Sequence, residues 1–506
     1  MRRWWLFAAT TGSLSMILLD TTMVGVILPT VQRELDLSTA ALQWVANAYL
    51  LTLAAFVAVG GRLADMFDPV RLFAVGVTVF ALASAAAGIA PSGEALIAAR
   101  AVQGVGAAVM MPASLAVVVA AFPPGERGRA VGLRAAISSA FLSIGPLIAG
   151  LLTAVASWRW VFWVNLPVSA ATLVAARLAH TERIKPTGAR FDTGGLLTLV
   201  PGLAAVVLAL MEATTWGWRS GATIALLVCG GALLVAFAVH ELRTRDPLVD
   251  LRLFRNRSFT ADASVLFLVQ FGLVGLTVFG AILLQDLLGF SPLEAGLAIL
   301  PTTLAITVVA PAAGRLYDRL GARLPLAAGS AITAIGLLWT AAVVDRLSYA
   351  WLAPGYVAVG IGIGLTAGPA NVDALGAAGP THRGQAAGLT QLLRQVGGAV
   401  GLACIGTLVT TVQHARLSDF LTGAGVSPDR VAGLQRILAE DPTSQHAIAA
   451  QVPRADLTAV VGVARDAVVD AIATAYYVAG GVVLVALVAV LALRRRSETG
   501  PAVAHG

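Results

Sequence analysis

The chain has 506 residues, of which 58% are hydrophobic and only 12% are charged, and its mean hydropathy is +0.84. This composition excludes an ordinary soluble domain, since such domains are about one-quarter charged. The formal charge is +7, from 34 Lys and Arg against 27 Asp and Glu. The basic residues are distributed unevenly between the predicted loops, so this charge does not indicate a nucleic-acid partner.

Fourteen apolar stretches, each long enough to cross a hydrocarbon core of about 30 Å, predict an all-α polytopic membrane protein. The stretches are continuous rather than alternating, and backbone groups in lipid must bond within their own segment, so barrel strands are excluded. The first stretch is too long for a cleaved signal sequence and contains Asp20, so we expect it in the mature chain. The predicted spans lie near residues 5–29, 42–63, 70–91, 95–120, 130–154, 158–178, 193–212, 219–239, 258–283, 292–313, 323–344, 350–372, 385–412 and 470–493.

The basic residues predict the orientation of these spans. An even number of spans places both termini on one side, and most of the 34 Lys and Arg residues fall on that side. The positive-inside rule therefore predicts cytoplasmic termini in the cell membrane. The arginines at 252, 255, 257 and 494–496 are expected to face anionic lipid headgroups, and Asp262 is expected to pair locally.

Two motifs occur twice, at nearly the same separation along the chain. Gly61–Asp65 and Gly314–Asp318 both read Gly-Arg-Leu-x-Asp, and residues 126–133 and 382–389 share Arg-Gly-x-Ala-x-Gly-Leu. Two matches of this kind indicate a duplicated bundle. In such a duplication Gly104 and Gly106 correspond to Gly360 and Gly362, which predicts the same close helix packing in both halves.

The duplication divides the chain into three parts. Residues 1–178 are predicted to form one six-helix bundle and residues 251–506 a second, pseudo-symmetric one that includes a long outer loop near 413–469. Residues 179–250 are a linker with two extra transmembrane helices. Two parallel six-helix halves with a site at their interface are typical of transporters. Such a site opens alternately to the two sides of the membrane when the halves rock against each other.

This layout resembles the major facilitator superfamily, and within it the fourteen-span drug:proton antiporter branch. The segments that carry the resemblance are LDTTMVGVILP (Leu19–Pro29), QWVANAYLL (Gln43–Leu51), GGRLAD (Gly60–Asp65), RAVQGVGAA (Arg100–Ala108), GPLIAG (Gly145–Gly150), WRWVFWVNLP (Trp158–Pro167) and RQVGGAVG (Arg394–Gly401). The resemblance implies two rocking halves and an exchange of drug for protons.

Asp20 in the first span and Arg100 in the fourth have no charged counterpart in the second half, where Leu273 and Tyr356 stand. At about 1.5 Å per residue, Asp20 lies about 13 Å and Arg100 about 9 Å below the outer surface, so the two can meet. A lone charge at that depth costs at least about 2.5 kcal/mol, so a pair or an aqueous cavity is expected. We expect Asp20 to exchange a proton and Arg100 to modulate its proton affinity. The alternative is a static ion pair that holds two helices together.

Both Gly-Arg-Leu-x-Asp motifs are predicted at cytoplasmic helix ends, where their aspartates can contact the other half through charge and helix dipoles. We expect them to act as latches that favour the state closed to the cytoplasm; the alternative is a role in topology alone. The first copy departs from the family pattern after its aspartate, so the first latch is expected to be weakened or rewired. The latch residues are Gly61, Asp65 and Arg71 in the first copy and Gly314, Asp318, Arg319 and Arg323 in the second.

Gly145 and Pro146 in the fifth span resemble the family's antiporter motif, and the proline has no counterpart in the second half. Proline bends or loosens a helix locally, while Gly145 and Gly150 allow close neighbours. The alternative is a proline that is merely tolerated. Arg394, deep in the thirteenth span, needs a partner; the alternative for it is a purely structural role.

The leading hypothesis is proton-driven efflux of small lipophilic or cationic drugs by a monomeric transporter, with substrate, protons and lipids as its only partners. No enzyme, metal or cofactor is expected: Lys185, the only lysine, is in no phosphate-binding loop, and Cys229 and Cys404 lie within spans. The alternatives are a proton symporter that imports a metabolite and, more remotely, a membrane sensor that transports nothing.

Overall fold

The computed structural model describes residues 2–179, 191–423 and 457–494. These residues form helices and short connections, with no strand among them, and fourteen helical segments are long and apolar enough to cross a membrane. The number of spans predicted from the sequence is therefore confirmed for this part of the chain.

The first half contains α1 to α7, of which α6 and α7 together form the sixth span. Two further helices, α8 and α9, form a hairpin, and the second half contains α10 to α17. The transmembrane helices are α1 (Arg2–Glu34), α2 (Thr39–Met66), α3 (Pro69–Gly88), α4 (Gly93–Ala121), α5 (Arg127–Val155), α6 (Trp160–Trp163), α7 (Asn165–Ala179), α8 (Thr193–Trp216), α9 (Gly221–Arg243), α10 (Arg257–Ile282), α11 (Pro292–Leu320), α12 (Arg323–Val343), α13 (Tyr349–Ala378), α14 (Arg383–Gly423) and α17 (Leu457–Leu493). The short turns are η1 (Pro124–Glu126), η2 (Leu251–Arg255), η3 (Leu283–Leu287), η4 (Val344–Arg346) and η5 (Pro380–His382).

Several helices begin at a polar side chain that caps their first turn. Ser38 accepts a hydrogen bond from the Ala41 amide at the start of α2, and Asp68 accepts from the Val70 and Arg71 amides at the start of α3. Such caps satisfy the amides that have no partner within the helix. The helix α5 has no side-chain cap from its own preceding residue, Glu126.

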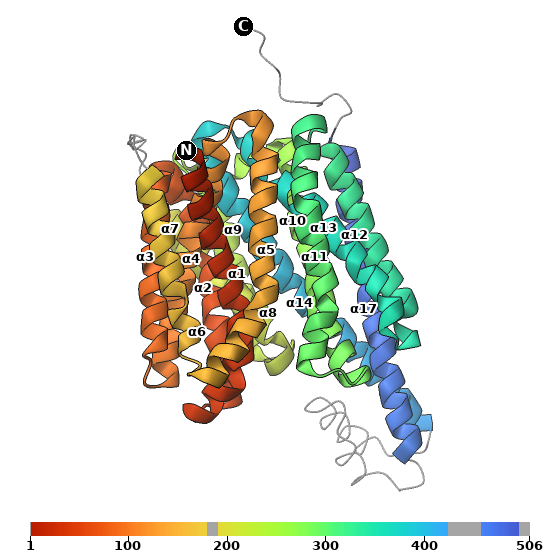
Figure 1. Cartoon of the computed structure of the whole chain (residues 1–506). Helices are drawn as coiled ribbons and strands as arrows, with labels where there is room; N and C mark the ends of the chain where they lie inside the picture. Colours follow the sequence, from red (N-terminus) through yellow and green to blue (C-terminus); the bar gives the residue numbers. More distant parts are fainter. Residues whose placement is uncertain (1, 180–190, 424–456, 495–506) are drawn as a thin grey trace.

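The two halves repeat the same set of helix contacts. In the first half α1 packs on α5 and α7, and α4 packs on α2 and α3; in the second, α10 packs on α14 and α17, and α13 packs on α11 and α12. The halves stand side by side and touch through α5 against α11 and α2 against α14 (Figure 1). This pattern supports the duplication predicted from the motifs.

Equivalent glycines make the helix packing equivalent. A Cβ on Gly104 would lie 2.4 Å from the Tyr49 carbonyl oxygen, and one on Gly360 would lie 2.2 Å from the Thr302 carbonyl oxygen. No side chain fits at either position, so α4 on α2 and α13 on α11 approach to backbone contact, as predicted for both halves.

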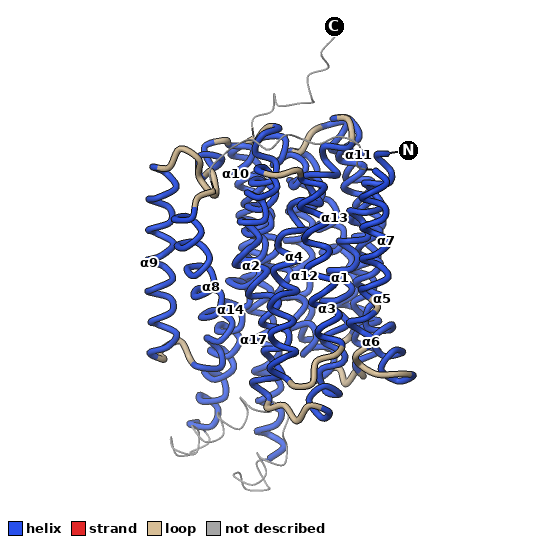
Figure 2. The backbone as a smooth tube through the Cα atoms, turned by 90° about the vertical axis from the view of Figure 1, so that its left-hand side faces the viewer, coloured by secondary structure: helices blue, strands red, loops and turns tan. Residues whose placement is uncertain are grey.

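The hairpin of α8 and α9 stands at one edge of the bundle (Figure 2). The helix α8 packs on both α2 and α14, so it covers one side of the boundary between the halves, and α9 packs mainly on α8. His240 and Asp192 are hydrogen bonded, with 2.9 Å between Nε2 and Oδ1, and this contact joins α9 to the residue capping α8.

Both α1 and α17 have one end on the same side of the bundle, at the top of Figure 1, where α1 begins and α17 ends. We call this side the terminal end. The predicted outer loop near 413–469 joins two long helices: α14 continues to Gly423 and α17 begins at Leu457, whereas the segments apolar enough to cross a membrane end at Gln413 and begin at Arg465. Residues 424–456 lie outside the described part of the chain.

Candidate functional site

Asp20 on α1 and Arg100 on α4 meet inside the first half. The distance between Arg100 Nη1 and Asp20 Oδ2 is 2.6 Å, and the two residues are 1% and 0% exposed. The depths counted along the sequence therefore placed the pair correctly. A pair of charges buried this deeply is tolerated only with good geometry and further hydrogen bonds.

Two amide side chains supply those further bonds to Asp20. Gln103 Nε2 and Asn165 Nδ2 both donate to Asp20 Oδ1, at 2.9 and 3.0 Å. Gln103 was not predicted, although its position three residues after Arg100 places it on the same helix face. Asn165 lies in the family segment 158–167, and nothing in its sequence context indicated that it reaches α1.

Arg100 is held from three directions. Its Nε donates to the Val45 carbonyl at 3.1 Å, its Nη1 also donates to Gln103 Oε1 at 2.7 Å, and its guanidinium lies 4.4 Å from the centre of the Tyr49 ring. These contacts fix the positive charge whether or not Asp20 is ionised.

Asp65 and Asp318 each cap a helix of the opposite half at the terminal end. Asp65 on α2 accepts from the amides of Gly384 and Gln385 at 2.6 and 2.8 Å, at the start of α14. Asp318 on α11 accepts from the amides at the start of α5 in the same way, at 2.8 and 2.9 Å. The cap that α5 does not receive from its own half comes from the other one.

The two repeated motifs are therefore binding partners of each other. Each Gly-Arg-Leu-x-Asp copy binds the Arg-Gly-x-Ala-x-Gly-Leu copy of the opposite half, so the two contacts are related by the pseudo-symmetry. The two bonds of the first copy match those of the second in number and length. The weakening or rewiring of the first latch therefore stays a prediction without support from these contacts. Of the basic residues assigned with the motifs, Arg71 and Arg319 are exposed and Arg323 is half-buried at the start of α12.

The glycines of these motifs let the halves touch at the backbone. A Cβ on Gly61 would lie 2.4 Å from the Gly384 carbonyl oxygen, and one on Gly314 would lie 2.1 Å from the Gly128 carbonyl oxygen. Farther along the boundary, Ser139 and Thr307 are hydrogen bonded at 2.7 Å between α5 and α11. The halves are thus closed against each other at the terminal end.

The Gly145–Pro146 segment brings α5 against α1 close to Asp20. A Cβ on Gly145 would lie 2.0 Å from Thr22 Oγ1, and Thr22 is two residues after Asp20. Pro146 lies inside α5 without ending it. The expectation of a close neighbour at Gly150 is wrong, because Gly150 is exposed and a Cβ there would meet no atom within 4 Å.

Arg394 lines a cavity of about 80 Å³ between the halves, together with Arg134 from α5. Arg134 is 5% exposed and donates to the Thr10 carbonyl and to Ser114 Oγ at 3.1 and 2.7 Å. Within the described residues Arg394 has no hydrogen-bond or ion-pair partner, so the predicted partner is missing, and Gln391 does not bond to it. Arg134 lies within the predicted span 130–154, and nothing in its sequence context distinguishes it as a site residue.

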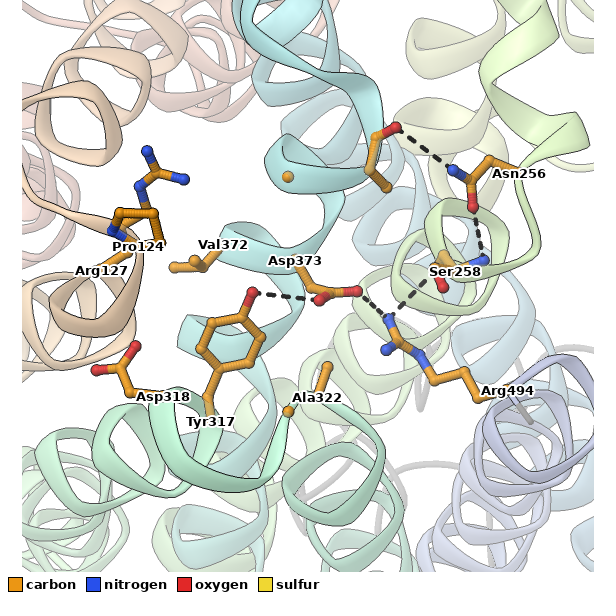
Figure 3. Close-up of a pocket in the computed structure, with 13 residues that line it drawn as sticks. Pro124, Arg127, Asn256, Ser258, Tyr317, Asp318, Ala322, Val372, Asp373 and Arg494 are labelled. Atoms are coloured by element: carbon orange, nitrogen blue, oxygen red, sulfur yellow. Dashed lines mark hydrogen bonds and ion pairs between the residues drawn. The ribbon is translucent and has the colours of Figure 1, made fainter. Parts of the chain in front are cut away.

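A second buried charge cluster lies at the terminal end of the second half. Arg494, directly after α17, pairs with Asp262 on α10. It also pairs with Asp373 on α13, and Tyr317 Oη donates to Asp373 Oδ1 at 3.2 Å (Figure 3). The cluster borders a cavity of about 400 Å³ that also reaches Arg127 of the first half. The expectation that Arg494 faces lipid is wrong, because it is 4% exposed, and the partner of Asp262 is distant in sequence rather than local.

Comparisons with known proteins decide the family. The model of the Major Facilitator Superfamily matches residues 10–402. The chain belongs to this superfamily. It is a multi-pass membrane transporter and not an enzyme, and its fourteen spans agree with the fourteen-span branch.

Similar proteins within the superfamily include antibiotic resistance and export proteins. The chain is 38% identical to the puromycin resistance protein pur8 of Streptomyces alboniger, over 85% of this chain and 86% of that protein. It is 32% identical to the tetracenomycin C resistance and export protein of Streptomyces glaucescens, over 98% and 92%. The solved structure of a bacterial homologue of the iron transporter ferroportin, 13% identical, covers 97% of this chain and 99% of its own with a TM-score of 0.62, which supports the fold.

Proposed function

We propose that this protein exports small, largely apolar compounds, antibiotics among them, from the cytoplasm in exchange for protons. The observation that carries the proposal is the Asp20–Arg100 pair, a fully buried ionisable pair whose equivalent positions in the second half are occupied by uncharged residues. Drug resistance and export in the similar proteins support the direction of transport. The uneven distribution of basic residues supports a cytoplasmic terminal end and a location in the cell membrane.

In this proposal Asp65 and Asp318 are latches of the state closed to the cytoplasm. Each places a carboxylate on the amides of a helix start in the other half, where the helix dipole favours a negative charge. Opening toward the cytoplasm separates both pairs at once. Both contacts lie on the same boundary between the halves, so they form again at the same time when the halves close. The motif glycines allow the backbones to meet there.

The helix α5 provides a mechanical link between the proton site and one latch. Toward the C-terminal end of α5, Gly145 packs against Thr22, two residues after Asp20. At the N-terminal end of α5, the backbone amides donate hydrogen bonds to Asp318. A proton on Asp20 weakens the attraction between α1 and α4, and a shift of α1 is transmitted to α5 at Gly145. Proton binding can thus favour one state of the boundary over the other, which is what coupling requires.

Transport in everted membrane vesicles tests the proposal. With a lumen more acidic than the medium, so that protons leave as the substrate enters, we expect wild-type vesicles to accumulate a fluorescent lipophilic substrate until the gradient is collapsed, and Asp20→Asn vesicles to lose this accumulation. Asparagine keeps the volume and one acceptor oxygen, so Gln103 and Asn165 retain a partner and the variant should fold.

Asp36→Asn is the matched control. Asp36 is exposed and has a φ of 51°, a conformation that asparagine adopts readily, so the same substitution there should leave transport unchanged. Undiminished proton-driven accumulation by Asp20→Asn would remove Asp20 from the mechanism. Proton-driven accumulation of the substrate in intact cells, and not in everted vesicles, would instead identify an importing symporter.

A further inference from the structure

The cavity between the halves has an unusual charge balance. Its walls come from α1, α4 and α5 of the first half and from α13 and α14 of the second, and its charged side chains are Arg134 and Arg394. Among the described residues no carboxylate lines this cavity. Two cationic groups therefore face one small space from opposite halves, close enough for the charge of Arg394 to act on Arg134.

The polar groups around the two arginines do not neutralise them. The Nε of Arg394 and Oε1 of Gln391 are buried without a partner, and Gln391 is 9% exposed. Asn371, also in the wall, uses its amide nitrogen on the Ala367 carbonyl at 2.7 Å. Burying a charged group without a counter-charge is unfavourable, and here the buried Arg134 and the half-buried Arg394 share one cavity.

The nearest acid along α13 cannot serve as the missing counter-charge. Asp373 lies two residues after Asn371, about 200° around the helix, and it is bound by Arg494 and Tyr317. Asp20 is paired with Arg100 and receives bonds from two amides. Within the described residues the negative charge that this cavity requires is therefore not supplied by the protein.

We propose that the pocket between Arg134 and Arg394 binds an anionic group, a carboxylate or phenolate, of the transported compound. The guanidinium group suits this role because its fork of N–H donors matches the two oxygens of a carboxylate. Each half contributes one arginine, so an anion bound between Arg134 and Arg394 contacts both halves. Its binding therefore depends on the distance between the halves. The inference rests on the proposed export function and narrows its substrates to acidic, otherwise apolar compounds.

Arg394 offers the cleaner variant. It makes no hydrogen bond within the described residues, so Arg394→Gln removes a charge without breaking a contact, whereas Arg134→Gln also gives up the bonds to Thr10 and Ser114. We expect Arg394→Gln to fold and to unfold at the same temperature as the wild type or a higher one. Arg394→Lys keeps the charge but loses the fork.

Equilibrium binding to the full-length protein in lipid nanodiscs tests the site directly. The probes are radiolabelled 1-naphthylacetate and 1-naphthylacetamide, which have nearly the same shape and differ in charge. We expect the wild type to bind the acid about tenfold or more tightly than the amide, the size expected for one charge-assisted hydrogen bond. Arg394→Gln should abolish this difference, and Arg394→Lys should keep part of it.

Arg243→Gln is the control for a general loss of positive charge, since Arg243 is exposed at the end of α9, in the hairpin outside the two halves. It should retain the preference for the acid. No saturable binding of the acid to the wild type, equal affinity for acid and amide, or a preference that survives Arg394→Gln would each overturn the inference. The measurement uses no proton gradient, so it can succeed even if Asp20→Asn leaves transport unchanged, and it can fail while proton-driven export is confirmed.

Discussion

Removing the Asp65 carboxylate should open the terminal end of the bundle by a measurable amount. In Asp65→Ala the amides of Gly384 and Gln385 lose their acceptors at the start of α14. Loss of an aspartate cap costs about 0.5–2 kcal/mol, and a partly buried charge at a helix dipole contributes up to about 2 kcal/mol. We therefore expect about 1–2 kcal/mol, which increases the ratio of open to closed protein about 5- to 30-fold.

The second contact provides an internal test of this magnitude. Asp318→Ala removes the same two bonds from the start of α5, so its effect should be of similar size. Because the two contacts share no partner and report on one equilibrium, their free energies should add in the double variant, to about 2–4 kcal/mol or about 30- to 900-fold. A double variant no more open than either single one would show that the contacts do not act on the same equilibrium.

Cysteine labelling measures the opening. In a background without the native cysteines, Cys229 and Cys404, a cysteine at Ala367 reports access to the cavity between the halves. A membrane-impermeant maleimide added to everted vesicles should label it faster in Asp65→Ala, by the factor given above.

Asp68→Ala is the matched control, because Asp68 caps two amides within its own half at the start of α3. Its loss should lower the stability of the protein but leave the labelling rate unchanged. The reasoning is refuted if Asp65→Ala labels at the wild-type rate, or if Asp68→Ala accelerates labelling as much as Asp65→Ala does.

Two further substitutions test close packing and buried charge. Gly314→Val places side-chain atoms on the backbone of Gly128 and should abolish transport in a folded protein, whereas Gly150→Val, with open space around it, should transport normally in the same vesicle assay. Arg494→Gln leaves the fully buried Asp262 without its counter-charge and should destabilise the protein by at most about 3–5 kcal/mol, seen as a lower melting temperature in detergent; an unchanged melting temperature would contradict the pairing.

The sequence by itself determined the spans, the duplication and the depth of the first-half charges. The lipid environment explains this success, because a span must be an unbroken apolar helix, and a fixed rise per residue turns position into depth. Asp20 and Arg100 could therefore be placed at one level from residue counts alone. The glycine pattern shared by Gly104 and Gly360 likewise predicted close packing that the structure contains.

Only the tertiary structure decided which side chains meet at a given depth. Depth does not fix the rotation of a helix about its axis or its neighbours, and these depend on packing across the whole bundle. The partner of Asp65 lies more than 300 residues away, at a helix start whose repeated motif does not by itself indicate which residue binds it. For the same reason the convergence of Arg134 and Arg394, and the burial of Arg494, could not be predicted from their positions along the chain.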